Sequence, residues 1–299
     1  MRVADIQQEI ESLAPGQSSP SGATRRIAIK TALGAGYAAA VSPIMAQTAI
    51  NTSAEGLATG RVQYEVAGFK VPAYYAAPKG KTSGLPVVLV VQEIFGVHEY
   101  IADTCRRFAK AGYLAIAPEL YARQGDPTQY GEIAKLITEV VAKVPDAQVM
   151  ADLDGAVQWA GAHGGDLSKV AITGFCWGGR ITWLYAAHGA VKAGVAWYGR
   201  LVGASSALTP RHPVDVAAKL HAPVLGLYGA ADEGIPLDTI DKMKTALAGG
   251  NAVAQASQFV VYPDTPHAFH ADYRPSFRKG PAEDGWARAL AWFKTHGVA

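Results

Sequence analysis

A cysteine occupies the nucleophile position of the segment 174–179, which reads GFCWGG. The segment falls between a short apolar run and an expected helix. Small residues two positions before and two after a nucleophile allow a sharp strand-to-helix turn that exposes its side chain. This turn would also place the sulfur of Cys176 at a helix N-terminus, where free N–H groups favour a thiolate and a developing oxyanion. On this motif alone, a buried structural cysteine explains the residues equally well.

An acid and a base follow the cysteine in two later loops. Asp232 lies in the glycine-flanked loop after the apolar run 224–228, and His267 lies in the loop after the run 258–262. Alone, a loop Asp is usually a turn residue and a loop His is usually solvated. Together with Cys176 they give the order nucleophile, acid, base, each after a separate strand. In such a triad His267 takes the proton of the thiol, while Asp232 orients the imidazole.

Strand-like and helix-like segments alternate along most of the chain. We expect a hairpin at 62–66 and 70–77, and strands at 85–91, 113–117, 170–173, 191–198, 224–228 and 258–262. We expect helices at 100–111, 129–144, 147–162, 178–187, 237–248 and 284–294. This alternation predicts an α/β fold with a mostly parallel sheet and helices on both faces. Ligands of such sheets bind beyond the carboxyl ends of the strands, where all three reactive residues fall.

Further segments resemble the dienelactone hydrolase family of α/β-hydrolases. They read QEIFG at 92–96, PELYAR at 118–123 and PHAF at 266–269, and the likeness runs from about residue 60 onward. The resemblance implies that Glu93 pairs with the resting neutral thiol of Cys176 and releases it when substrate arrives. A neighbouring carboxylate disfavours the thiolate and so protects the sulfur from oxidation. The resemblance also implies an oxyanion hole formed by the backbone N–H groups of Trp177 and Ile94. The alternative for Glu93 is a surface carboxylate near a helix.

The arginines that hold the substrate carboxylate in dienelactone-cleaving members are missing from their usual places. The segment 126–149 contains no arginine, and Ala271 stands four residues after His267. Arg123 and Arg274 lie elsewhere near strand ends, and arginine is the natural clamp for a carboxylate. We expect these two arginines, together with Tyr121 and Tyr198, to contact the substrate. Dienelactone itself is left open as the substrate.

The first 46 residues differ in composition from the rest of the chain. Arg25 and Arg26 precede a weakly apolar, Ala-rich run at 27–45, which resembles a twin-arginine export signal with cleavage after Ala46. The run is too short and too polar for a lasting membrane span. We therefore expect an export signal at 1–46, a linker at 47–59 and one α/β-hydrolase domain at 60–299. The export machinery would then be a partner and the product periplasmic or secreted. The alternative is an amphipathic helix of a cytoplasmic protein.

Composition narrows the ligands that the chain can bind. The net charge is +2 over 299 residues and the lysines and arginines are scattered, so nothing indicates nucleic-acid binding. The two cysteines, Cys105 and Cys176, form neither a disulfide framework nor a metal-ligand spacing. We expect Cys105 to be a core residue. We expect neither a metal nor a cofactor, and a small molecule as the ligand.

The residues predict a hydrolase that cleaves a small ester or lactone through a thioester at Cys176. A non-catalytic periplasmic binding protein on the same scaffold is the alternative, and it would form no acyl-enzyme. A thiol redox protein is disfavoured because no resolving cysteine lies near Cys176 in the sequence. The other candidate bases, His188 and His212, have no matching acid and are expected to be surface or structural residues.

Overall fold

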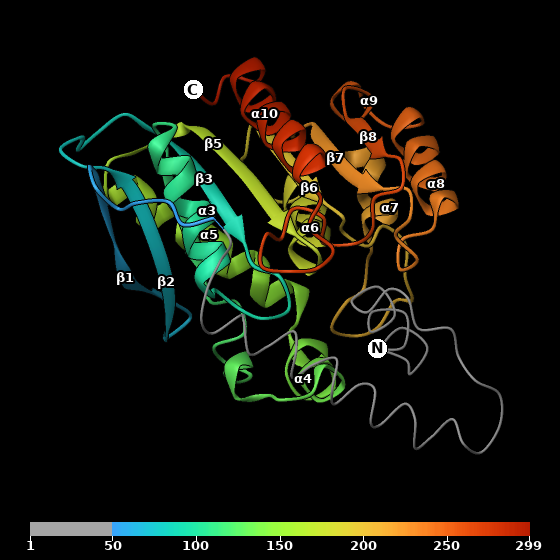
Figure 1. Cartoon of the computed structure of the whole chain (residues 1–299), viewed down its shortest axis with the longest axis horizontal. Coiled ribbons are helices and arrows are strands. Elements are labelled where there is room, and N and C mark those ends of the chain that lie inside the picture. The colour runs from blue at the N-terminus through green and yellow to red at the C-terminus, as the bar shows by residue number, and fades with distance from the viewer. Residues whose placement is uncertain (1–49) are drawn as a thin grey trace.

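A single eight-stranded sheet forms the centre of the molecule, with the strand order β1-β2-β4-β3-β5-β6-β7-β8 (Figure 1). The computed structural model describes residues 50–299, so the expected export signal at 1–46 lies outside the described residues. β1 pairs antiparallel with β2 and β2 antiparallel with β4, whereas all other neighbours are parallel. The mostly parallel α/β-hydrolase sheet predicted from the sequence is thereby confirmed. The strands are β1 (Leu57–Val66), β2 (Phe69–Pro78), β3 (Leu85–Val91), β4 (Leu114–Pro118), β5 (Gly165–Phe175), β6 (Ala193–Trp197), β7 (Val224–Gly229) and β8 (Gln258–Tyr262).

β1 and β2 form the expected hairpin at the edge of the sheet, and their turn is shorter than the expected one. Its two turn residues, Ala67 and Gly68, have φ angles of 49° and 79°. Two consecutive positive φ angles match the right-handed twist of the strands that the turn joins. β1 already begins at Leu57, so part of the range expected as a linker, 47–59, belongs to the sheet.

Helices cover both faces of the sheet, which explains why the parallel strands are continuous apolar runs. α3 and α10 lie on one face, where the ring of Phe108 lies 4.5 Å from that of Trp286 (Figure 1). α5 and α6 lie on the other face, and a hydrogen bond of 2.8 Å from Tyr185 to Asp154 joins them. The helices are α3 (Glu99–Lys110), α4 (Ile133–Glu139), α5 (Asp146–Ala162), α6 (Trp177–Ala186), α7 (Pro213–Val216), α8 (Leu237–Ala248), α9 (Ala252–Gln255) and α10 (Lys279–Thr295), with short 3-10 turns η1 (Pro127–Gln129), η2 (Val141–Lys143) and η3 (Ala217–Lys219).

Two expected helices have other limits in the structure. The helix expected at 129–144 is broken into η1, α4 and η2, and α4 ends at Glu139. Its C-cap Val140 has φ −119° and ψ −70° and is followed by a second valine, and β-branched residues lose side-chain freedom in a helix. The last helix starts at Lys279 rather than at 284, because Pro281 falls in its first turn, where proline is tolerated.

The helices of residues 50–299 do not meet the requirements of a membrane-spanning helix. Over that range no helix combines the length and the apolarity that a membrane crossing needs.

Candidate active site

Cys176 lies in a strained turn between β5 and α6. Its φ of 54° and ψ of −115° are rare for a residue with a side chain, and such strain collects at functional sites. The turn requires glycine on both sides of the cysteine. A β-carbon at Gly174 would lie 2.2 Å from the carbonyl oxygen of Gly178, and one at Gly178 would lie 2.5 Å from that of Gln92. The glycines of the GFCWGG pattern are therefore needed because β5 and α6 approach each other closely at this turn.

Substituting Gly178 tests this packing. The variant Gly178→Ala should lower the free energy of unfolding by about 1–3 kcal/mol, because backbone carbonyl groups cannot move away from the added methyl. The matched control is Gly280→Ala, at a position in α10 where an added β-carbon meets nothing within 4 Å. Equilibrium unfolding in urea measures the free energy of unfolding of both variants. Equal stability of the two would contradict the close approach of α6 and β3.

His267 and Asp232 form a buried pair in the loops after β8 and β7. The Nδ1–H of His267 donates to Oδ2 of Asp232 at 2.6 Å. The other carboxylate oxygen, Oδ1, accepts the backbone N–H of Gly234 at 3.0 Å. Both carboxylate oxygens of Asp232 therefore accept hydrogen bonds. Because Nδ1 of His267 is hydrogen-bonded to Asp232, Nε2 is the ring nitrogen that can exchange a proton with the thiol or a substrate. Nε2 of His267 is buried and has no hydrogen-bond partner among residues 50–299.

The surroundings of His267 favour its charged form. Burial lowers the pKa of the imidazole, but the Asp232 carboxylate and the sulfur of Cys176 outweigh burial and raise it to about 10. A proton that the imidazole takes from the thiol is therefore retained at neutral pH. This is the protonation state that a later proton donation to a leaving group requires.

Cys176 and His267 line the same small cavity, of about 70 Å³. Cys176 is only 4% exposed, yet it forms part of the wall of this cavity. Trp177 and Tyr198 line the cavity as well, so two further predicted site residues meet the thiol there. The remaining wall includes Val141, Ala142, Arg180, Arg200, His212 and Ile235.

The other predicted residues around the thiol lie at neighbouring strand ends. Trp177 is the first residue of α6, and the N–H groups of a first helical turn have no partner within the helix. Ile94 follows β3 and is fully buried. The ring of Tyr121 packs against Trp177 with centroids 4.9 Å apart, and Tyr198 packs against His267 at 5.1 Å. These positions are compatible with an oxyanion hole at Trp177 and Ile94, which stays a prediction.

Glu93 is buried, but the structure joins it to residues other than the thiol. Its Oε1 accepts the Nε2–H of His98 at 3.1 Å and the hydroxyl of Tyr273. Burial opposes ionisation, but the His98 hydrogen bond and the charge of Arg274 lower the pKa of Glu93 to about 2. Among residues 50–299 the hydrogen bonds of Glu93 do not include Cys176, so their pairing stays a prediction. The alternative of a surface carboxylate is wrong, because Glu93 is 2% exposed.

Arg274 and Arg123 lie in different environments. The guanidinium of Arg274 lies 5.0 Å from the ring centre of Phe95, and its charge contributes to the low pKa of Glu93. Arg123 instead donates to Asp152 of α5 at 2.5 Å and covers the ring of Phe69. Arg123 is not part of the described cavity wall, so the structure does not support the expected substrate contact. A carboxylate partner from a distant helix explains its position.

A buried ion pair that sequence analysis did not identify supports the cavity wall. Arg180 forms two hydrogen bonds of 2.7 Å with Asp146. Asp146 begins α5 directly after the segment that contributes Val141 and Ala142 to the cavity, so the pair ties that segment to α6. The spacing of four residues between Cys176 and Arg180 is one available signal, since such residues lie about one helical turn apart.

His212 and His188, the other two candidate bases, make contacts that indicate structural roles. His212 is buried and lines the cavity, and its Nε2–H donates to the carbonyl oxygen of Ala204 at 3.1 Å. Nε of Arg180 approaches Nδ1 of the same ring at 3.5 Å, so both nitrogens are engaged. His188 is an exposed residue that pairs with Asp154 at 3.0 Å. Neither histidine combines a carboxylate partner with a place in the cavity that Cys176 lines, as His267 does.

The described part of the chain offers no metal site. Across residues 50–299, no three His, Cys, Asp or Glu side chains are grouped so that they could hold a metal ion. Cys105, the other cysteine, is a buried residue of α3, as expected.

Comparisons with known proteins identify the family of this chain. Residues 71–297 match the sequence profile of the dienelactone hydrolase family. A “Putative carboxymethylenebutenolidase” of Methylorubrum extorquens is 60% identical over 278 residues, which cover 92% of this chain and 94% of the relative. One of the same description from Escherichia coli K12 is 54% identical over 88% of this chain and 96% of its own. The crystal structure of a “putative dienelactone hydrolase” from Klebsiella pneumoniae superimposes with a TM-score of 0.77 at 58% identity, covering 80% of this chain and 98% of that one. The chain therefore belongs to the dienelactone hydrolase family and is a hydrolase of that type.

Proposed function

We propose that this hydrolase cleaves a small ester or lactone, with Cys176 as nucleophile, His267 as acid and base, and Asp232 as the group that orients His267. The observation that carries the proposal is the meeting of three chain segments at one end of the sheet. The Asp232 carboxylate holds the imidazole at 2.6 Å, and the same imidazole lines one cavity with the thiol. A carboxymethylenebutenolidase-like reaction, as in the names of the relatives, falls within this substrate class.

The reaction proceeds in two halves. First, with the proton of the thiol already on His267, the thiolate of Cys176 attacks the acyl carbon, and a carbon–sulfur bond forms. The N–H groups of Trp177 and Ile94 stabilise the oxyanion. The carbon–oxygen bond then breaks as His267 protonates the leaving oxygen. In the second half, water attacks the thioester carbon and gives one proton to His267. The carbon–sulfur bond then breaks, the acid product leaves, and the thiolate of Cys176 and the imidazolium of His267 are restored.

The cavity favours a short acyl group. The cavity is small, with a volume of about 70 Å³, and side chains such as Val141 and Ile235 make part of its wall apolar. Arg180 and Arg200 line the same cavity, so the acyl group is expected to be small but not wholly apolar.

A screen of purified full-length protein against short-chain aryl esters and five- and six-membered lactones tests the proposal. We expect saturable turnover of at least one compound class, with rates that fall as the acyl chain lengthens beyond the cavity. Saturable binding without turnover of any ester or lactone would contradict the proposal and favour a binding protein on this scaffold.

We further infer export by the twin-arginine route, to the periplasm or beyond. The arginine pair at 25–26 and the Ala-rich run at 27–45 support this inference. Protein isolated from its native host should begin at Gln47, as determined by mass spectrometry of its N-terminal peptide. A native protein that still begins at Met1 would contradict export and favour a cytoplasmic enzyme.

A further inference from the structure

A buried carboxylate on α3, Asp103, collects hydrogen bonds from three residues. Its Oδ1 accepts the backbone N–H of Thr52 at 2.6 Å and Nη2 of Arg106 at 3.0 Å. Its Oδ2 accepts Nε of Arg107 at 2.6 Å and the hydroxyl of Thr52 at 3.3 Å. The side chain of Asp103 has no exposure to solvent. A buried carboxylate with this many donors is costly to disturb, because losing one cation leaves charge uncompensated.

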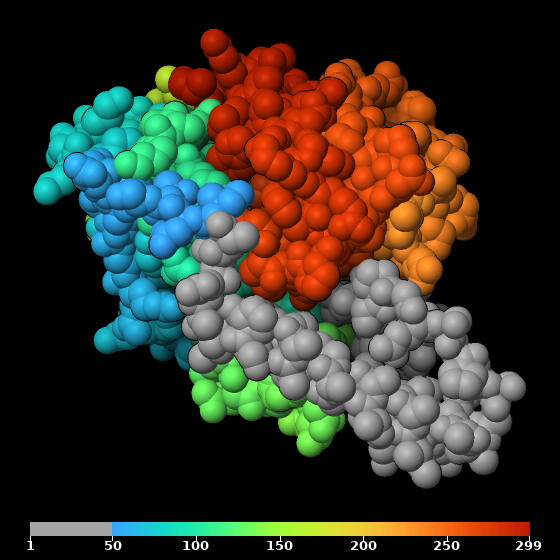
Figure 2. All heavy atoms as spheres, in the orientation of Figure 1, coloured from blue at the N-terminus to red at the C-terminus, as the bar shows by residue number. Residues whose placement is uncertain are grey.

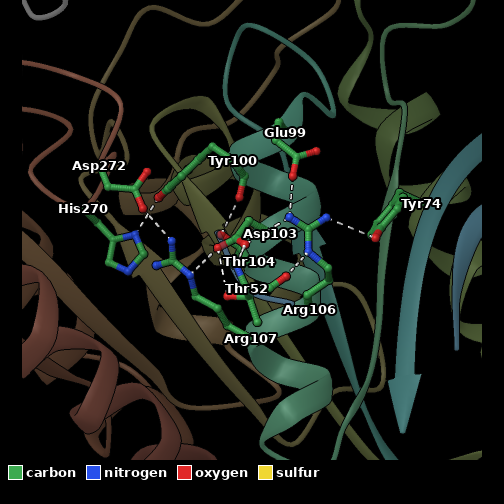
Figure 3. A network of polar contacts seen from close by, with 10 residues as sticks. All are labelled: Thr52, Tyr74, Glu99, Tyr100, Asp103, Thr104, Arg106, Arg107, His270 and Asp272. Carbon is green, nitrogen blue, oxygen red and sulfur yellow. Dashed lines mark hydrogen bonds and ion pairs between the residues drawn. The ribbon is translucent and has the colours of Figure 1, made fainter. Parts of the chain in front are cut away.

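Arg107 links this carboxylate to the loop that carries His267. Its Nη2 donates at 2.5 Å to Asp272, which lies five residues after His267. The Asp272 side chain is also without solvent exposure, and burial raises its pKa while the charge of Arg107 opposes that effect. One guanidinium thus separates two buried carboxylates, one on α3 and one on the loop (Figure 3).

The loop has a second attachment to the same helix. The hydroxyl of Tyr100 lies 2.6 Å from Nδ1 of His270, one turn of α3 before Asp103 (Figure 3). Within the loop, the backbone N–H of Ala271 donates to the carbonyl oxygen of Ala268 at 3.0 Å. Ala268, directly after His267, has a positive φ of 57°. A short turn with these constraints transmits a shift at Asp272 to His267.

The chain segment at 50–55 contributes Thr52 to the hydrogen-bond network around Asp103. Besides its contacts to Asp103, Thr52 accepts Nε of Arg106 on its carbonyl oxygen at 2.9 Å. In the space-filling view this blue segment crosses the front of the molecule and meets the orange-red surface of the C-terminal part (Figure 2). The part of the expected linker nearest to β1 therefore packs on the helix that holds the His267 loop.

We propose that Arg107 is a positioning residue, which keeps the His267 loop in its reactive place through Asp272, with Thr52 and Asp103 as its support. The inference rests on the proposed function, since it assigns His267 a role in turnover. Without the guanidinium, Asp103 and Asp272 face each other as buried like charges and move apart. A displacement of about 1 Å in a reacting group can cost on the order of 100-fold in rate.

The variant Arg107→Gln tests the proposal in full-length protein, with Arg288→Gln as the control, because Arg288 forms an exposed pair with Asp284 on α10. We expect kcat for the best ester of the screen to fall roughly 10- to 100-fold with KM nearly unchanged. Arg107→Lys should recover part of the loss, and the control should keep the activity of the unmodified protein. The low-field proton NMR signal of the His267–Asp232 hydrogen bond should shift or broaden in Arg107→Gln.

The outcomes separate this proposal from the proposed function. Activity in the unmodified protein with unchanged kcat in Arg107→Gln would overturn the positioning role alone. A lower kcat with an unshifted His267 signal would also overturn it, because the loss would then come from elsewhere in the fold. If Arg107→Gln does not fold, Asp272→Asn takes its place, and an unchanged kcat and proton signal there would overturn the proposal. An unmodified protein without any ester or lactone turnover would contradict the proposed function instead.

Discussion

Cys176→Ala should abolish ester turnover, with kcat at least about 10⁴-fold below that of the unmodified protein. The physical reason is that, in the described structure, Cys176 is the only thiol in the cavity wall that includes His267. The substitution removes one sulfur atom at a position that faces a cavity, so the fold should persist. Steady-state kinetics with the best substrate of the screen measures the loss, and circular dichroism checks the fold.

The chain supplies its own control for this experiment. Cys105 is fully buried in α3, and burial raises the pKa of its thiol far above the usual value. Cys105→Ala should therefore leave kcat within about twofold, since a neutral buried thiol is unreactive. Retained activity in Cys176→Ala, or equal losses in the two variants, would contradict the assignment of the nucleophile.

Asp232→Asn should lower kcat by on the order of 10⁴-fold, because an amide no longer fixes the tautomer of His267 or stabilises its charged form. The variant should also change the titration of the ring. With Asp232, the pKa of His267 is raised to about 10, so the imidazolium persists at neutral pH and is lost as the pH rises through that value. Without the carboxylate, the effect of burial is less opposed and the pKa of His267 falls. The imidazolium is then lost at lower pH. NMR titration of the ring protons from pH 5 to above pH 10 measures the pKa of His267 in both proteins, and steady-state kinetics over the same range measures kcat.

An exposed pair of the same residue types is the control for Asp232. His188 and Asp154 lie 3.0 Å apart on the surface, and each is about half exposed. Asp154→Asn should leave kcat unchanged, since solvent screens such pairs. An Asp232→Asn variant with kcat within tenfold of the unmodified protein, or with an unshifted His267 pKa, would exclude the orienting role.

The fold and the central site could be predicted from sequence because their signals are local. The GFCWGG motif determines its own turn, since its glycines meet backbone atoms that any β-carbon would strike. Continuous apolar runs rich in β-branched residues, such as 85–91, favour strands buried on both faces, and their carboxyl ends then place the residues that follow at one edge. Asp232 and His267 follow two such runs, so their positions at that edge are predictable from the order of residues alone.

The contacts that were not anticipated join residues that are far apart in the sequence. Arg123 has a strand-end position compatible with substrate binding, but its partner Asp152 comes from the middle of α5. Glu93 accepts one of its hydrogen bonds from Tyr273, which is 180 residues later. Arg107 looks like an ordinary helical arginine until α3 and the His267 loop are packed together. Such ion pairs depend on tertiary packing, and no local pattern encodes them.

The measurement that tests the central claim most directly is rapid quenching of the protein with an activated aryl ester, followed by mass spectrometry of its peptides. We predict one acyl group on the peptide that contains Cys176, formed within the first turnover and stable enough to detect in Asp232→Asn. An acyl group on Cys105 or on a serine, or turnover without any adduct at residue 176, would contradict a thioester mechanism.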